Sequence, residues 1–335
     1  MSLRMIGVHI QNEQVAVQHL RNCPVATCVD CSPTYLQDVR GALPADSWLV
    51  VRTFYDPQRL ENPIGEAARW MDGTYDMRQA LRGVARTVFQ GYNEISDDMA
   101  APYLQFELER FRLMRREGSS GFGAIAASVG TPDYPKWALW RALLQGLDPK
   151  RDAVLLHEYW ARPSWLEDQH IICRFTQHEP THAIGTLPII ISETGRDKIW
   201  IDGKAYGWAG WKGRVSREGY LMELAEYGKR LLQARAAGYN VVGATVFTLG
   251  KIWDQWKAFD ANELLPALKE AWGPAEPIVT YRPPLATSEP LSAVFDKAPW
   301  HVEETIRCIE GGRLEEAIER LWALRDYIRK AGVNG

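Results

Sequence analysis

Short runs of apolar residues, many of them β-branched, recur along most of the chain. Each run is nearly continuously apolar rather than alternating with polar residues, which is the pattern of parallel strands buried on both faces. We therefore predict eight buried strands, at residues 5–10, 25–30, 47–54, 87–94, 121–129, 153–160, 187–194 and 241–249.

The segments between these runs carry helix signals. Ser32-Pro33 is an N-cap followed by a proline that suits the first helical turn. After Asp97-Asp98, apolar residues repeat every three or four positions up to a glycine, and the segment ending at Gly238 shows the same spacing. Strand and helix alternating eight times predict an α/β fold, a closed (β/α)₈ TIM barrel over residues 1–272.

The competing architecture is an open, doubly wound parallel sheet. That fold favours a glycine-rich, phosphate-binding turn directly after the first strand. The first predicted strand instead runs into the segment HIQNEQ, which contains no glycine. The pattern therefore favours the closed barrel.

The composition and the hydrophobic pattern of the chain change after Trp272. Residues 273–299 are rich in proline and predict an irregular strap, whereas residues 300–335 form two amphipathic segments broken at Gly311-Gly312. We interpret the second part as a C-terminal helical hairpin packed against the barrel. An oligomerisation or partner helix is the alternative, and the oligomeric state stays open.

Charge and hydropathy narrow the possible partners. The net charge of −3 and the pI near 6.2 argue against binding to nucleic acid or to an anionic membrane surface. The sequence has no run of about 18 apolar residues, so we expect no transmembrane helix. The opening MSLRMIGVHI is too short and too strand-like for a signal peptide. A signal could have been removed, so both a cytoplasmic and a secreted location remain open.

Two groups of residues resemble metal sites, and both have a simpler interpretation. Cys23, Cys28 and Cys31 lack a fourth ligand at a typical spacing, so we expect ordinary packing rather than zinc. The segment 178–182 spells H-E-x-x-H, but the zinc mechanism needs this motif on a helix. Pro180 opposes a helix there, so we expect a loop and no metal.

The chain is rich in aromatic residues, with 14 Trp and 13 Tyr. Flat apolar faces beyond the needs of a core suit the stacking of sugar rings, although a large barrel also buries tryptophans between strands and helices. The segment 199–213 interleaves aromatic residues with glycines and follows the seventh strand. We expect its Trp208 and Trp211 to stack on a sugar above the barrel mouth, unless the loop only packs on itself.

Reactive side chains stand where the predicted strands end, which is where barrel enzymes carry their active sites. Asn93-Glu94 closes strand four, Glu193 closes strand seven and Arg52 lies on strand three. Glu193 follows the apolar residues 189–191, and burying its charge costs free energy unless the charge is paired or has a function. Each glutamate also has a plainer interpretation. Glu193 could form a salt bridge with Arg52 or Arg196, and Glu94 could be a carboxylate that the dipole of a following helix stabilises.

Two facing carboxylates suit glycosidic cleavage. The departing oxygen needs a proton, the oxocarbenium-like centre needs an anion, and a separation of about 5–5.5 Å retains configuration. At this point the residues resemble clan A of the glycoside hydrolases over residues 5–272. The resemblance implies that Glu94 is the acid/base, that Asn93 binds the sugar 2-hydroxyl and that Glu193 is the nucleophile.

The end of strand six extends the resemblance. His157-Glu158-Tyr159 is similar to the His-x-Tyr of family 5 within that clan, which implies that Tyr159 hydrogen-bonds the nucleophile and His157 lines the site. Family 5 has an Arg near strand two and a Trp on strand eight. Here the nearest residues are Arg52 on strand three, and Phe247 with Trp253 behind it. The resemblance is therefore to the clan more than to family 5.

The sequence thus predicts a retaining glycosidase acting on a β-linked oligo- or polysaccharide without a metal or organic cofactor. Arg52 and Trp253 complete the expected substrate contacts. Alternation along strand six turns the rival carboxylate Glu158 outward. A catalytically inert carbohydrate-binding barrel is one alternative. A metal-dependent barrel hydrolase is another, for which His9 and His157 are a sparse ligand set.

Overall fold

The computed structural model describes residues 2–118, 120–132, 136–169, 171–177, 184, 186–201, 204–250 and 252–273. Residues 274–335 lie outside it, so nearly all of the predicted strap and the whole C-terminal helical hairpin lie outside the described residues. The H-E-x-x-H segment at 178–182 lies outside as well. In the described part of the chain, no helix is both long and apolar enough to cross a bilayer.

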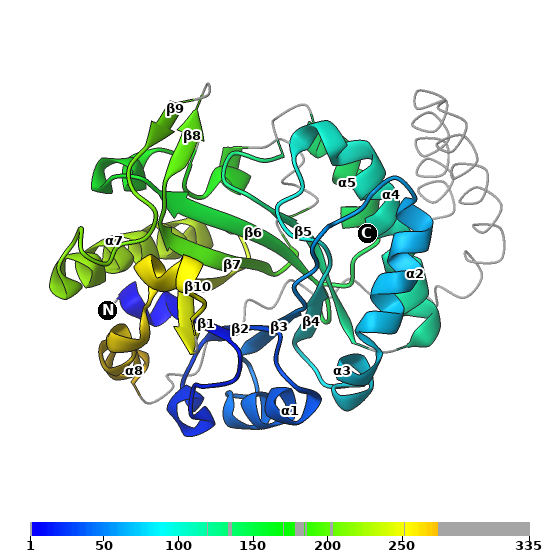
Figure 1. Ribbon diagram of the computed structural model, residues 1–335, viewed down its shortest axis with the longest axis horizontal. Helices are drawn as coiled ribbons and strands as arrows, with labels where there is room; N and C mark the ends of the chain where they lie inside the picture. The colour runs from blue at the N-terminus through cyan, green and yellow to red at the C-terminus, as the bar shows by residue number, and fades with distance from the viewer. Residues whose placement is uncertain are drawn as a thin grey trace. The chain divides into compact units, whose positions relative to one another are not determined.

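Eight parallel strands close into a barrel in the order β1-β10-β7-β6-β5-β4-β3-β2, as the apolar runs predict (Figure 1). Each run holds one strand, so the prediction of a (β/α)₈ barrel is confirmed. The barrel strands are β1 (Ile6–Gln11), β2 (Val25–Val29), β3 (Trp48–Arg52), β4 (Thr87–Gln90), β5 (Gly121–Ala127), β6 (Ala153–Trp160), β7 (Ile189–Arg196) and β10 (Val241–Gly250).

Helices cover the outside of the barrel. Ser32 and Ser216 cap two of them by accepting hydrogen bonds from the backbone N–H groups of Tyr35 and Gly219. The α-helices are α1 (Pro33–Ala42), α2 (Pro63–Gly73), α3 (Tyr75–Ala80), α4 (Ala100–Glu117), α5 (Trp137–Gln145), α7 (Arg217–Ala236) and α8 (Leu265–Trp272). The 3₁₀ helices are η1 (Ser2–Met5), η2 (Val17–Leu20), η3 (Asp97–Met99), η5 (Pro163–Glu167), η6 (Arg174–Gln177), η7 (Asp254–Phe259) and η8 (Asn262–Leu264).

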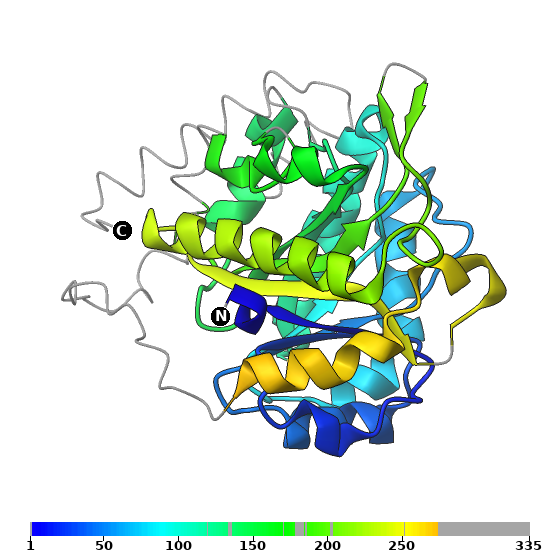
Figure 2. The same cartoon turned by 90° about the vertical axis from the view of Figure 1, so that its left-hand side faces the viewer.

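The described residues depart from an ideal barrel in the connection after β1 and in the connection after β7. Only η2 lies between β1 and β2, where an ideal barrel would have an α-helix. After β7 an additional antiparallel hairpin, β8 (Ile199–Ile201) and β9 (Lys204–Tyr206), precedes α7. Figure 2 shows this hairpin projecting away from the barrel.

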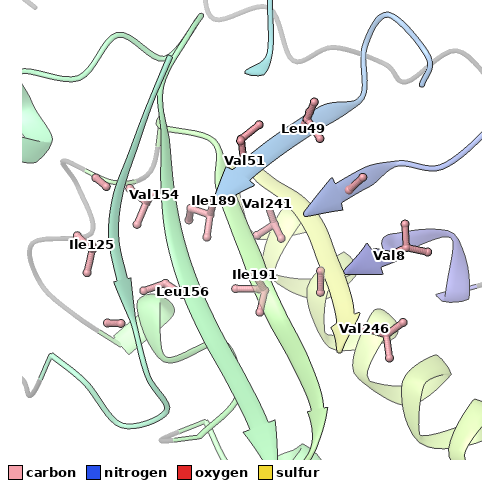
Figure 3. Close-up of a cluster of buried hydrophobic side chains, with 14 of the residues drawn as sticks. Val8, Leu49, Val51, Ile125, Val154, Leu156, Ile189, Ile191, Val241 and Val246 are labelled. Atoms are coloured by element: carbon pink, nitrogen blue, oxygen red, sulfur yellow. The ribbon is translucent and has the colours of Figure 1, made fainter. Parts of the chain in front are cut away.

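The core has two layers because side chains alternate along each strand. One layer packs between the strands and the helices, and Figure 3 shows part of it, including Val154, Leu156, Ile189 and Ile191. The other fills the barrel interior and consists of Val25, Trp48, Val50, Val88, Ala126, Ala153, Leu155 and Ile190. Residues that follow the interior layer along the strands face the barrel mouth, where the candidate site lies.

Candidate active site

A β-bulge in the middle of β7 aims Glu193 into the barrel mouth. Ile191 pairs with Leu156 of β6, but the next pair is Glu193 with His157, so β7 holds one extra residue at Ser192. The pairing with β10 shows the same extra residue. Since Ile191 faces the helices, strict alternation would turn Glu193 outward as well. The extra residue turns Glu193 to the opposite face, into the mouth. Bulges are common beside active sites, where they redirect a side chain in this way.

Glu193 is buried, with 6% of its surface exposed, and is surrounded by donors. Its Oε1 pairs with the guanidinium of Arg52, which ends β3, and its Oε2 accepts a hydrogen bond of 2.7 Å from the Tyr159 hydroxyl. Burial raises the pKa of Glu193, but His157, Arg52, His9 and the Tyr159 hydrogen bond together lower it to about 2. The group is therefore a carboxylate at neutral pH.

Glu94 lies on the loop just after β4, opposite Glu193. Its backbone has φ 52°, and its N–H donates to the carbonyl of Ala126 at 3.1 Å on neighbouring β5. Its Oε1 lies 2.8 Å from Nδ1 of His157, and its side chain is 37% exposed. Glu94 is thus positioned by β5 and β6 but remains open to solvent, whereas Glu193 is enclosed.

The two carboxylates lie close together. One oxygen of Glu94, one oxygen of Glu193 and a ring nitrogen of His157 all lie within 4.8 Å of one another. This separation is close to the spacing of about 5–5.5 Å that direct attack by a carboxylate requires, and shorter than the 6.5–9.5 Å that leaves room for an intervening water. The geometry suits a nucleophile and an acid acting on one bond.

A buried ion pair on α4 supports the strand end that carries Glu94. Arg110 bonds Glu107 at 2.8 Å and donates to the carbonyls of Phe89 at 2.9 Å and Gly123 at 2.7 Å, on β4 and β5. A side chain at Gly91 would meet Glu107 Oε1 at 2.3 Å, so glycine permits this close approach. The pair thus fixes the chain just before the Asn93-Glu94 loop.

Asn93 is held by two glutamines beside Glu94. Its Oδ1 accepts a hydrogen bond of 2.9 Å from Gln90, which ends β4. Gln58 bonds both the N–H and the carbonyl of Asn93, the latter at 2.9 Å. The sequence predicts that Asn93 binds a sugar hydroxyl, and these contacts fix its loop beside the carboxylates.

Glu158 faces away from the mouth, as alternation along β6 predicts. It is buried and accepts a hydrogen bond of 2.7 Å from the hydroxyl of Tyr227 on α7. Burial raises the pKa of Glu158 to about 7. Glu158 therefore links a strand to a helix and does not join the pair of carboxylates.

The structure separates the three predicted aromatic contacts. Trp208 is 58% exposed on the loop after β9, and Trp253 follows β10 with its ring 5.5 Å from that of Phe54. Trp211, in contrast, is 2% exposed and stacks on Tyr220 at 4.8 Å. Tyr220 of α7 covers the ring of Trp211, so this ring offers no open face for the sugar contact that the sequence predicts.

Three further residues lie close to the two carboxylates. The sequence names His9 only as a possible metal ligand and Phe247 only in place of a tryptophan, and it does not point to Asp197. His9 on β1 lies 3.7 Å from Glu193 and 3.0 Å from the Thr248 hydroxyl, and burial lowers its pKa to about 3, so it is neutral. Phe247 lies against the ring of His9 at 4.7 Å. Burial, together with the charges of Glu94 and Glu193, raises the pKa of Asp197 to about 6. Inward alternation on β1 was the available signal for His9.

The same cluster offers two carboxylates and an imidazole that could contact a metal. However, Arg52 already occupies Glu193 Oε1, and its permanent positive charge opposes a second cation at that oxygen. The donor set therefore fits acid–base chemistry better than a metal. Cys23, Cys28 and Cys31 are free and buried, and burial raises the pKa of Cys23 to about 12, so this thiol is a poor metal ligand.

No family model matches the chain, and no curated protein matches its sequence. Among solved structures, the chain is similar to XacCel5A at 12% identity and a TM-score of 0.46, covering 80% of this chain and 98% of that one. A plant β-glucan endohydrolase matches at 12% identity and a TM-score of 0.43, covering 72% and 90%. A GH128 endo-β-1,3-glucanase from Amycolatopsis mediterranei matches at 13% identity and 0.42, covering 80% and 99%. Likenesses this distant do not assign an activity.

Proposed function

We propose that the protein is a retaining glycoside hydrolase that cleaves β-glycosidic bonds by double displacement. The proposal is carried by one observation: oxygens of Glu94 and Glu193 lie within 4.8 Å at the barrel mouth. One carboxylate is enclosed among donors and the other is open to solvent. This asymmetry matches the different tasks of a nucleophile and an acid/base.

In the first step, Glu193 attacks the anomeric carbon of the sugar. The bond from this carbon to the glycosidic oxygen breaks as Glu94 gives its proton to that oxygen, and a glycosyl ester forms on Glu193. Arg52 and the Tyr159 hydroxyl hold the attacking carboxylate in place. His157 fixes the orientation of Glu94 through its contact at 2.8 Å.

In the second step, Glu94 acts as a base. It takes a proton from a water molecule whose oxygen attacks the anomeric carbon, and Glu193 leaves as a carboxylate. Two inversions restore the β configuration, and Glu94 is protonated again for the next cycle. Asn93 is proposed to bind the 2-hydroxyl, and Trp208 and Trp253 to contact further sugar units of an oligo- or polysaccharide.

Hydrolysis of aryl β-glycosides and β-linked oligosaccharides by the full chain tests this proposal. We expect Glu193→Gln to lose turnover by about 10⁴-fold or more, because the nucleophile is removed. Glu94→Ala should lose most turnover on poor leaving groups, which need its proton. With an activated leaving group, added azide should speed the second step by attacking the glycosyl ester and give a β-glycosyl azide. Glu158→Gln is the matched control and should hydrolyse at the rate of the wild type.

Two results would redirect the assignment. Full activity of Glu193→Gln would contradict its role as nucleophile. A wild type that binds these glycans but hydrolyses none of them would instead indicate a carbohydrate-binding barrel.

A metal-dependent hydrolase is the second candidate function, because Glu94, His157 and Glu193 form a cluster that could contact a metal ion. Loss of activity on treatment with a chelator, restored by a divalent metal, would favour it.

A further inference from the structure

A cleft of about 630 Å³ lies on the rim of the barrel, beyond the ends of β6 and β7. This volume is in the range of small-molecule binding sites, which is about 300–1,000 Å³. The two strands are the ones that carry His157, Tyr159 and Glu193. The cleft is lined by Ala161, Arg162, Pro163, Arg196, Ala205, Tyr206, Gly207 and Trp208.

The cleft is shaped by a close approach of two chain segments. Gly207 has φ 74°, and a side chain there would meet the Ala161 carbonyl at 2.7 Å. Glycine therefore lets the loop after the β8–β9 hairpin pack directly against the end of β6. Residues of β9 and of this loop line one side of the cleft, and the first residues after β6 line the other.

Two aromatic residues, Tyr206 and Trp208, line the cleft. Trp208 is 58% exposed, although tryptophan usually buries most of its ring. The ring of Tyr206 lies 5.7 Å from that of Trp165. Flat, apolar faces with polar edges are suited to stacking on sugar rings.

Two arginines lie over these rings and have no acidic partner among the described residues. Arg162 lies 5.6 Å from the ring centroid of Tyr206 and 5.8 Å from that of Trp165. Arg214 lies 4.3 Å from the ring centroid of Trp208. Stacking uses the face of a guanidinium and leaves its edge free to donate two parallel hydrogen bonds to an anionic group.

Among the residues that line the cleft, Arg162 is the cation without an acidic partner in the described part of the chain. Arg196 also lines the cleft, but it donates to both oxygens of Glu223, at 2.7 and 2.8 Å. Lys198 lies 4.7 Å from the ring centroid of Trp200, and its charge acts on Asp197. A ligand in the cleft therefore meets Arg162 as an exposed cation next to an aromatic wall, within a chain of net charge −3.

We propose that this cleft binds an acidic sugar unit of the substrate, one that carries a carboxylate or a sulfate. The edge of Arg162 receives the anionic group, and the sugar ring stacks on Trp208, which Arg214 holds in place. The inference rests on the proposed glycosidase function and names its substrate class: an anionic β-glycan rather than a neutral one.

Affinity electrophoresis of the full chain tests this inference with three polymers on one β-glucan backbone. Hydroxyethyl cellulose is neutral, carboxymethyl cellulose carries carboxylates and cellulose sulfate carries sulfates. We expect retardation by at least one anionic polymer and much weaker retardation by the neutral one. Arg162→Gln should raise the apparent dissociation constant about tenfold, because a charge-assisted contact is lost. The polymer that responds more strongly identifies the anionic group.

Lys150→Gln is the matched control, since Lys150 is exposed in the turn before β6, at the other end of that strand. It removes the same charge and should leave the dissociation constant unchanged. Equal weakening by both substitutions, no effect of Arg162→Gln, or equal binding of the neutral polymer would overturn the inference. Arg162-dependent binding without hydrolysis of any β-glycoside would retain the acidic subsite and reject the proposed function.

Discussion

At the scale of single residues, Glu193 shows how a buried carboxylate is kept charged. Burial alone raises the pKa of a carboxyl group by favouring its neutral form. Around Glu193, the nearby His157, Arg52 and His9 and the hydrogen bond from the Tyr159 hydroxyl reverse this effect and lower the pKa to about 2. Burial lowers the pKa of His9 to about 3, and its Nε2 lies 3.7 Å from Oε1 of Glu193.

Arg52→Met tests this electrostatic account. A catalytic Glu193 must be ionised, so its lowered pKa keeps the wild type active below pH 4.5, the ordinary value for glutamate. Without the guanidinium the pKa of Glu193 rises, and activity is lost at higher pH as the solution is acidified. We expect the acidic limb of the kcat/KM profile to move up by about 1 to 3 pH units.

Arg69→Met serves as the control for this profile. Arg69 is 48% exposed on α2, pairs with Glu66 and donates a hydrogen bond of 3.0 Å to the Tyr92 hydroxyl. Its acidic limb should coincide with that of the wild type. An acidic limb that stays in place in Arg52→Met would show that Arg52 does not set the ionisation of Glu193.

At the scale of elements, the ends of the strands determine which side chains meet. Alternation places His157 and Tyr159 in the mouth and turns Glu158 and Trp160 toward α7. In β7, the extra residue at Ser192 brings Glu193 to the same side as Tyr159. A single-residue bulge thus decides whether the carboxylate faces the mouth or the helices.

The contact between β6 and α7 predicts how stability depends on pH. The pKa of Glu158 is about 7 in the folded chain, against 4.5 for an ordinary glutamate. The unfolded chain therefore releases this proton between pH 4.5 and 7 while the folded chain keeps it. The folded state loses about 3 kcal/mol from this group as the pH rises through that window.

Glu158→Gln should remove this loss, because glutamine is neutral and still offers an acceptor to the Tyr227 hydroxyl. Urea denaturation at pH 4.5 and at about pH 8 measures the free energy of unfolding. The decrease between the two pH values should be smaller in the variant by about 3 kcal/mol. Glu226→Gln, on the same helix, should show the decrease of the wild type. Parallel pH dependences in all three proteins would contradict the role given to Glu158.

The strands were predictable from the sequence, but their ends were less so. Strands that are buried on both faces are nearly continuously apolar, so they can be recognised in the sequence without knowing which strands they pair with. All eight runs contain a barrel strand. The strand predicted to reach Glu94 ends at Gln90, and the chain leaves the extended conformation beyond it, with φ 52° at Glu94. The bulge at Ser192 leaves no trace in the sequence, since it depends on pairing with β6 and β10.

At the scale of the whole molecule, the barrel gathers residues that are far apart in the chain. Arg52 and Glu193 are separated by 141 positions, yet they form an ion pair. Strand order alone predicted that these groups share one mouth, because parallel strands of a barrel end at the same face. Their separation could not be predicted, since it depends on side-chain placement.

The aromatic residues show the limit of sequence reasoning at this scale. Trp208 and Trp211 lie three positions apart in a glycine-rich loop, and the sequence gives no reason to treat them differently. The fold separates them, because Tyr220 of α7 stacks on Trp211 and leaves Trp208 in the rim cleft. Exposure of a loop side chain depends on the elements that pack on it, and these lie elsewhere in the sequence.

The most direct test of the account is to trap the covalent intermediate on Glu193. A 2-deoxy-2-fluoro β-glycoside with an activated leaving group, built on the best aryl substrate, slows the second step more than the first. Mass spectrometry of the full chain should then show one glycosyl unit per molecule, and peptide mapping should place it on Glu193. An adduct on another carboxylate, or turnover that yields the α-anomer first, would contradict the retaining mechanism with Glu193 as nucleophile.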